Sequence, residues 1–119
     1  MVAGRSALVV EDNNEIARFI SLVLSQIGFV VSVAGDGQVA LDTLSDGPSD
    51  LVVLDLNIPK ITGVEVLRRI RADERLTHTK VVVVSANPHM IDESYDLADL
   101  VLQKPVSYSQ LHDLIERLF

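Results

Sequence analysis

Residues 51–55, Leu-Val-Val-Leu-Asp, decide the fold of this 119-residue chain. Four aliphatic residues stand in a row and a carboxylate follows them. The same arrangement occurs at residues 7–10, before Glu11-Asp12, and at residues 81–84, before Ser85. Runs that are apolar throughout, rather than alternating, are typical of strands buried on both faces, as in a parallel sheet covered by helices on each side. They therefore predict an α/β fold.

Stretches with helical spacing alternate with the apolar runs. In the first of them Asn13 or Asn14 is a candidate N-cap, and Gly28 stands where a helix commonly ends. The predicted strands cover residues 7–10, 29–34, 51–54, 81–84 and 100–102; the predicted helices cover about 16–27, 37–46, 63–72, 88–95 and a last segment carrying Leu111, Leu114, Ile115 and Leu118. Five strand–helix units in succession predict a doubly wound, five-stranded parallel sheet with five helices, in one domain over residues 1–119.

Composition narrows the classes of function. The net charge of −7 argues against a free-standing nucleic-acid binder, which would show a basic face. The chain has no cysteine, so disulfides, thiolate metal sites and cysteine nucleophiles are excluded. No apolar run is long enough to cross a bilayer, and the N-terminus has no apolar segment of the secretory type. We therefore expect a cytoplasmic protein without membrane contact.

Polar residues capable of chemistry stand where the predicted strands end. Glu11-Asp12, Asp55, Ser85 and Lys104 each follow or close a different strand. Since the carboxyl ends of parallel strands meet at one edge of the sheet, these side chains are expected in one cleft. Clustered carboxylates need a cation, and oxygen ligands suit Mg²⁺ or Mn²⁺. A carboxylate beside such an ion can attack phosphorus and form an acyl phosphate.

Four motifs in this order carry a resemblance to a known family. They are Leu8–Asn13, Asp55–Pro59 with Gly63, Val84–Ala86, and Lys104-Pro105. Over essentially its whole length the sequence resembles the receiver domains of two-component signalling, such as the chemotaxis regulators. The resemblance implies a flavodoxin-like sheet with strand order 2-1-3-4-5.

The resemblance also implies a role for each site residue. Asp55 would accept the phosphoryl group, and Ser85 and Lys104 would contact it; the Mg²⁺ ligands would be Asp12 directly, Glu11 through water, Asp55, and the backbone carbonyl of Asn57. Asn57 and Asn87 would tune dephosphorylation, and the Lys104–Pro105 bond would be cis. Such a domain is a phosphorylation-driven switch that catalyses its own phosphotransfer and autodephosphorylation, rather than an enzyme acting on other substrates.

The implied partners are a sensor histidine kinase or a histidine phosphotransfer protein, which would donate the phosphoryl group, and a downstream target. A homodimer formed on phosphorylation is also allowed, and no DNA-binding output is expected within these residues. Two departures from the family pattern concern the output. Val101 stands three residues before Lys104, where the family has an aromatic switch residue, and the stretch from Ser85 to Lys104 is shorter than usual, which predicts a short fourth helix.

Two other functions remain open at this point. The first is a pseudo-receiver, an interaction module that works without phosphorylation, which Val101 favours. The second is an enzyme on a related fold. A flavin site would need a phosphate-binding loop after the first strand, and a phosphatase would want an acid where Asn57 stands. None of the three histidines, His78, His89 and His112, is spaced from another potential ligand as in a metal site. A solvated helix face is the interpretation given to the four arginines Arg68, Arg69, Arg71 and Arg75.

Overall fold

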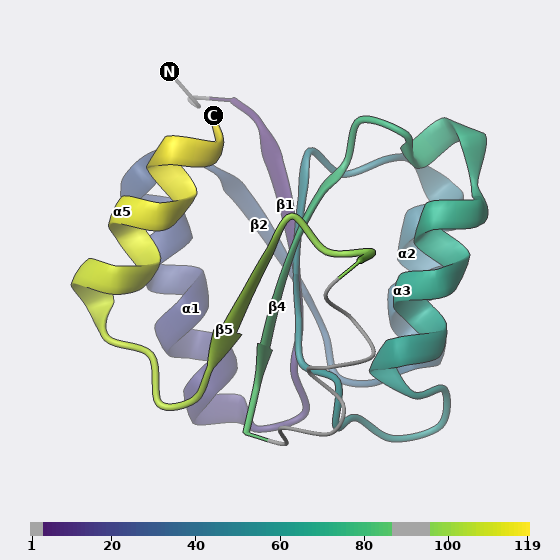
Figure 1. Ribbon diagram of the computed structural model, residues 1–119, viewed down its shortest axis with the longest axis horizontal. Helices are drawn as coiled ribbons and strands as arrows, with labels where there is room; N and C mark the ends of the chain where they lie inside the picture. The colour runs from purple at the N-terminus through teal and green to yellow at the C-terminus, as the bar shows by residue number, and fades with distance from the viewer. Residues whose placement is uncertain (1–3, 87–95) are drawn as a thin grey trace.

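The computed structural model describes residues 4–86 and 96–119, and a parallel sheet forms its centre (Figure 1). Its strands are β1 (Ser6–Val10), β2 (Val30–Ala34), β3 (Leu51–Leu54), β4 (Lys80–Ser85) and β5 (Leu100–Gln103). The sheet has five strands in the order β2-β1-β3-β4-β5, and every pairing is parallel. The predicted fold class and strand order are confirmed.

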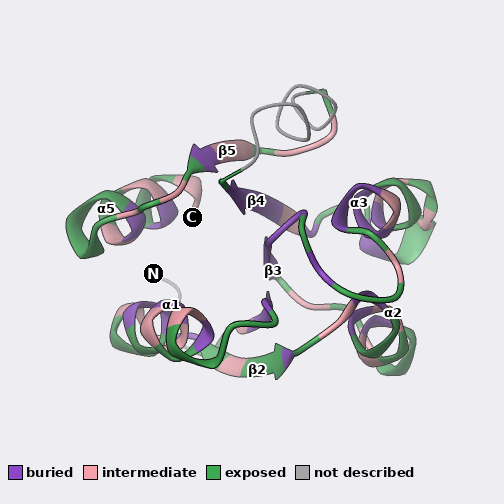
Figure 2. Cartoon of the chain, turned by 90° about the horizontal axis from the view of Figure 1, so that it is seen from below, coloured by how far each residue is buried: buried purple, intermediate pink, exposed green. Residues whose placement is uncertain are grey.

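Helices cover both faces of the sheet. They are α1 (Asn14–Ile27), α2 (Gly37–Asp46), α3 (Gly63–Ala72) and α5 (Tyr108–Leu118), with a short 3₁₀ helix, η1 (Glu74–Leu76). Figure 2 shows α1 and α5 on one face, α2 and α3 on the other, and their buried sides turned inward. The short fourth helix, predicted over residues 88–95, lies outside the described residues, as does Asn87.

The core consists of two apolar layers, one on each side of the sheet. Side chains of β1, β3 and β4 contribute alternately to both layers, so nearly all residues of these strands are buried. This two-sided burial is the reason that their sequences are apolar throughout rather than alternating. In the described part of the chain, no helix combines the length and the apolar character that crossing a membrane requires.

Side-chain caps begin α1 and α2, and the cap of α1 is one of the two predicted asparagines. The Asn13 side chain accepts a hydrogen bond from the Ile16 amide at 3.0 Å, and Asp36 accepts one from Val39 at 2.8 Å. Each bond satisfies an amide that has no partner within the helix. Gly28 ends α1 with φ 123°, a conformation that a side chain would strain. The first helix is therefore bounded by residues visible in the sequence.

A close backbone approach explains the glycine at the start of α3. A Cβ atom on Gly63 would lie 2.3 Å from the Cα of Leu56 and 2.6 Å from the carbonyl oxygen of Asp55. The Gly63 amide donates to the Leu56 carbonyl at 3.0 Å. The first turn of α3 thus packs directly on the backbone that follows β3, and this contact sets the position of Asp55.

The solvated face predicted for the arginines of α3 and η1 is confirmed for Arg68, Arg69 and Arg75, which are exposed, but not for Arg71. Arg71 is half-buried and donates to the carbonyls of Leu97 at 2.7 Å and Thr79 at 2.9 Å, and to the Asp99 carboxylate at 2.8 Å. Arg75 pairs with Asp73 at 2.7 Å. That prediction was wrong for Arg71, because the fold brings three acceptors from separate segments around its guanidinium group.

Candidate functional site

Two neighbouring strands bring carboxylates together at the carboxyl edge of the sheet, which is the lower edge in Figure 1. Val10 pairs with Leu54 across β1 and β3, so Glu11 and Asp55 leave the sheet side by side. The Asp55 amide donates to the Val10 carbonyl at 3.0 Å. Glu11, Asp12 and Asp55 each offer a carboxylate oxygen, and these atoms lie within 4.8 Å of one another. We call these three residues the strand-end cluster.

Lys104 enters this cluster from the end of β5. Its ammonium group donates to Glu11 Oε1 at 2.7 Å and to Asp55 Oδ2 at 3.1 Å. The Lys104 amide donates to the carbonyl of Ser85, the last residue of β4, at 3.0 Å. The Lys104–Pro105 bond is cis, as predicted. One ammonium group therefore bridges two of the three carboxylates.

Burial and pairing act in opposite directions on the charges of this site. Burial raises the pKa of Glu11 above its ordinary value, and the hydrogen bonds from Lys104 and from the Asn13 amide offset this only in part. Burial by itself would lower the pKa of Lys104, but the hydrogen bonds to Glu11 and Asp55 raise it overall. The ammonium group therefore stays charged, while the Glu11 carboxylate carries an uncompensated cost of desolvation.

The remaining predicted residues lie around the same edge. Asn57 is exposed, and its amide donates to Asp55 Oδ1 at 3.0 Å, which holds the carboxylate in one orientation. Asp12 is exposed, whereas Ser85 is fully buried at the end of β4. Val101 is half-buried, pairs with Val83, and packs against the core on the α2–α3 side. The structure thus brings the side chains of Glu11, Asp12, Asp55 and Lys104 together, and it places Ser85 at the end of β4, next to Lys104 in the sheet.

An apolar cavity of about 430 Å³ adjoins this site. It lies between α1 and the segment that leads from β5 into α5, and is lined by Ile16, Phe19, Ile20, Val84, Ala86, Lys104, Pro105, Val106 and Leu111. Sequence reasoning missed the cavity, because its walls come from four separate segments and each of its aliphatic and aromatic lining residues alone looks like an ordinary core residue.

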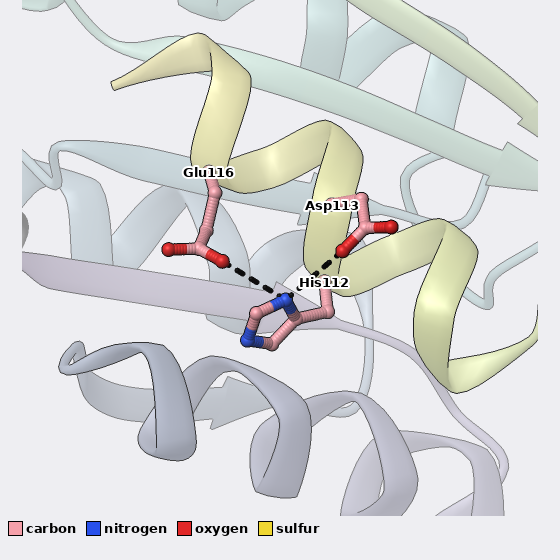
Figure 3. A group of neighbouring side chains, drawn as sticks. All are labelled: His112, Asp113 and Glu116. Atoms are coloured by element: carbon pink, nitrogen blue, oxygen red, sulfur yellow. Dashed lines mark hydrogen bonds and ion pairs between the residues drawn. The ribbon is translucent and has the colours of Figure 1, made fainter.

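A second group of potential ligands lies on α5. Figure 3 shows Nδ1 of His112 directed at two carboxylates, Asp113 Oδ1 at 3.3 Å and Glu116 Oε1 at 3.0 Å. One ligand atom from each residue lies within 4.8 Å of the others, and we call this group the α5 cluster. The prediction that no histidine has ligand spacing is wrong for His112. The signal was present in the sequence, since His112 and Glu116 stand one helical turn apart.

Comparison with known proteins identifies the family. The model of the response regulator receiver domain matches residues 7–116, which is nearly the whole chain. The chain therefore belongs to the response regulator receiver domain family of two-component systems, as the motifs predicted.

Individual relatives agree with this assignment. The chain is 35% identical over 116 residues to the chemotaxis protein CheY of Pseudomonas aeruginosa, and the match covers 94% of each. It is 36% identical over 107 residues to the response regulator ArlR of Staphylococcus epidermidis, covering 87% of this chain and 48% of that protein. The chain thus spans about half the length of the ArlR relatives that it matches.

Solved structures show the same fold. The receiver domain from Methylobacillus flagellatus superimposes with a TM-score of 0.86 at 28% identity, covering 97% of this chain and 98% of that one. The phosphorylated cyanobacterial phytochrome response regulator RcpA gives a TM-score of 0.82 at 33% identity, covering 98% and 91% of the two chains. The likeness extends over the strand ends where the candidate site lies.

Proposed function

We propose that this domain accepts a phosphoryl group on Asp55 in the presence of Mg²⁺ and changes conformation to signal to a partner. The observation that carries the proposal is the strand-end cluster with Lys104, in which two carboxylates share one ammonium group at the carboxyl edge of the sheet. The family supports it, since receiver domains are phosphoryl-accepting switches.

The chemistry of the donor set fits a magnesium ion. Only oxygen atoms are offered by Glu11, Asp12 and Asp55, and hard divalent cations prefer such ligands. Asp12 and Asp55 would bind the ion directly, Glu11 would bind through water, and the backbone carbonyl of Asn57 would complete the protein ligands. A bound Mg²⁺ ion supplies positive charge that offsets the charge developing on the phosphoryl oxygens.

The residues of the chain supply the remaining parts of the transfer. A carboxylate oxygen of Asp55 attacks phosphorus, a P–O bond forms as the P–N bond of a phosphohistidine donor breaks, and the imidazole leaves. The amide of Asn57 orients the attacking carboxylate at 3.0 Å. Lys104 then exchanges its bond to Asp55 for one to a phosphoryl oxygen, because the carboxylate charge has moved onto the phosphoryl group. Positioning and charge are most of what this chemistry requires.

The donor would be a sensor histidine kinase or a histidine phosphotransfer protein, and the cavity beside Lys104 supports a docked donor. Ile16, Pro105 and Val106 form an apolar wall next to the strand-end cluster. An apolar surface of this kind suits the side of a partner helix that presents its phosphohistidine to Asp55. Val106→Glu should therefore slow transfer from a phosphohistidine protein but leave phosphorylation by acetyl phosphate unchanged; equal slowing with both donors would contradict docking at this wall.

The response would start at Ser85 and Lys104, which are joined through their backbone hydrogen bond. The Ser85 hydroxyl would bind a phosphoryl oxygen, and the shift would pass to β5 through Lys104. Val101 packs in the core at the place where the family has its aromatic switch residue. We infer that the output of this domain depends on a shift of β5 rather than on rotation of an aromatic ring at that position.

Intact-mass measurement tests the phosphoacceptor. The protein is incubated with Mg²⁺ and acetyl phosphate or phosphoramidate, and the wild type should gain one phosphoryl mass. Asp55→Asn should gain none, while Asp42→Asn, an exposed α2 residue bonded to Gln38, should behave as the wild type. A gain that survives in Asp55→Asn would refute the assignment. No gain in the wild type would instead favour the phosphorylation-independent interaction module.

Omitting the metal tests the cofactor. In EDTA the phosphoryl gain of the wild type should disappear, and Asp12→Asn should need far more Mg²⁺ than the wild type for the same rate. Phosphorylation at an undiminished rate in EDTA would contradict the metal site. If the protein hydrolyses an added phosphomonoester, and Asp55→Asn abolishes this hydrolysis, the domain would instead be a phosphatase.

A further inference from the structure

The α5 cluster lies apart from the strand-end cluster and has no part in the proposed phosphoryl transfer. Its side chains come from one helix, with His112 and Asp113 adjacent and Glu116 one turn further on, and the two carboxylates converge on one nitrogen atom of His112 (Figure 3). The His112 side chain is 28% exposed, whereas those of Asp113 and Glu116 are 65% and 56% exposed. The imidazole is thus held against the protein while the carboxylates reach it from the solvent side.

The spacing of the ligand atoms fits a small tetrahedral ion. Zinc–nitrogen and zinc–oxygen bonds of about 2.0 to 2.1 Å at tetrahedral angles place two ligand atoms about 3.3 Å apart. The Nδ1 atom of His112 lies 3.0 Å from the oxygen of Glu116 and 3.3 Å from the oxygen of Asp113. These two separations match two edges of a coordination tetrahedron, although they are also ordinary hydrogen-bond distances. The third separation, between the two carboxylate oxygens, is at most 4.8 Å, and rotation of an exposed carboxylate would shorten it to a tetrahedral edge.

A second contact fixes the imidazole ring. Tyr108 stacks on His112 with the ring centroids 5.5 Å apart, and the Tyr108 hydroxyl donates a hydrogen bond to the Gln26 side chain on α1. A ring supported in this way loses little conformational freedom when a metal binds, which favours binding. His112 is thereby oriented by contacts other than those to its own carboxylates.

The local charges favour a cation. Within the described residues, no lysine or arginine lies at ion-pair distance from Asp113 or Glu116. Glu116 lies in the last turn of α5, where the helix dipole is negative, so its charge is unfavourable there. The strand-end cluster differs in this respect, because Lys104 already pairs with two of its members.

We propose that His112, Asp113 and Glu116 form a zinc-class metal site on α5, separate from the Mg²⁺ site at the strand ends. The imidazole selects a borderline transition ion such as Zn²⁺, whereas the all-oxygen set of Glu11, Asp12 and Asp55 selects Mg²⁺. The protein supplies three ligands and water completes the tetrahedron. Such an ion would hold α5 in the conformation in which Tyr108 contacts α1.

Calorimetric titration of the whole chain with Zn²⁺, in buffer saturated with Mg²⁺, tests the site. The wild type should bind one Zn²⁺ ion. His112→Gln and Glu116→Gln should each raise the Kd by at least about tenfold. His78→Gln changes an exposed histidine outside the cluster and should leave the Kd unchanged. Nuclear magnetic resonance of the wild type should show Zn²⁺-dependent shifts of the His112 and Tyr108 ring signals.

Several outcomes would overturn the proposal. The first is that the wild type binds no Zn²⁺ at all, and the second is that His112→Gln binds it with an unchanged Kd. Binding that disappears in Asp12→Asn but persists in His112→Gln would assign the ion to the strand ends. Because Glu116 is exposed, its substitution separates loss of a ligand from loss of folding. Phosphorylation of His112→Gln by acetyl phosphate should equal that of the wild type, so the two proposals fail independently.

Discussion

The strand-end cluster and the α5 cluster each bring three ligand atoms within 4.8 Å, but the chain builds them in opposite ways. Glu11 and Asp55 are distant in the sequence and meet only because β1 and β3 pair in register. His112 and Glu116 meet because they stand one helical turn apart, and Asp113 directly follows His112 in the chain. The first cluster exists only in the folded sheet, whereas the second needs little more than a formed α5.

Burial separates the two clusters further. Glu11 and Asp55 are only 3% and 6% exposed, so the cost of their charges depends on Lys104 and on any bound ion. The carboxylates of the α5 cluster face water, which screens them. The strand-end cluster is therefore coupled to the stability and conformation of the whole domain, and the α5 cluster is coupled to one helix. This coupling to the whole domain makes the strand-end cluster, rather than the α5 cluster, suited to a conformational switch.

The largest expected effect comes from removing the ammonium group of the strand-end cluster. Without Mg²⁺, Lys104→Ala should lower the free energy of unfolding by roughly 3 kcal/mol, since buried carboxylates lose their cation. Mg²⁺ should restore more stability to this variant than to the wild type, because the ion takes over the lost charge. Urea unfolding measures both. Lys60→Ala is the control, since Lys60 is exposed and 3.8 Å from Asp36, and an equal loss there would contradict the argument.

A smaller effect is expected from the backbone that positions Asp55. Gly63→Ala should lower the free energy of unfolding by about 2 kcal/mol, because the added methyl group meets the backbone of Leu56 and Asp55. Phosphorylation by acetyl phosphate should slow as well, while Zn²⁺ binding at the α5 cluster should not change. The matched control is Gly35→Ala, whose Cβ would meet no atom within 4 Å. A neutral Gly63→Ala would show that α3 can move without cost.

The pH dependence of stability distinguishes the buried cluster. The folded state raises the pKa of Glu11 above its ordinary value of 4.5, so the native protein binds this proton more tightly than the unfolded chain does. The free energy of unfolding should therefore fall as pH rises from the ordinary value through the folded value, and should not change further above it. Glu11→Gln lacks this dependence.

Urea midpoints in Mg²⁺-free buffer, compared between Glu11→Gln and the wild type at several pH values, test this expectation. The stability of Glu11→Gln relative to the wild type should increase with pH over that interval. A difference that stays constant with pH would show that Lys104 compensates the Glu11 charge completely.

The smallest effect is expected at the α5 cluster. Glu116→Gln removes an exposed contact to His112 one turn away and should change the free energy of unfolding by at most about 0.5 kcal/mol in EDTA. Excess Zn²⁺ should increase the difference in the free energy of unfolding between the wild type and Glu116→Gln, because only a chain that binds the ion is stabilised by it. Thermal unfolding in EDTA and in Zn²⁺ measures the two conditions. A large loss in EDTA would mean that α5 depends on this contact without metal.

Sequence reasoning reached the fold and the strand-end residues because both leave local signals. Continuous apolar runs mark strands buried on both faces, and a polar residue at the end of each run marks the carboxyl edge. The interpretation of Arg71 was wrong for the opposite reason, because its contacts leave no local signal. Its three acceptors, on Leu97, Thr79 and Asp99, are brought together by the fold, and nothing adjacent to Arg71 in the sequence announces them.

The sequence by itself determined the class of fold, the end of the first helix at Gly28 and its start at Asn13 or Asn14, and the identity of the residues at the strand ends. Each of these depends on periodicity, capping or chain order. Only the tertiary structure decided that Lys104 bridges Glu11 and Asp55, that burial makes the Glu11 charge costly, and that an apolar cavity adjoins the site. Distances and desolvation arise when segments distant along the chain meet, so no local pattern contains them.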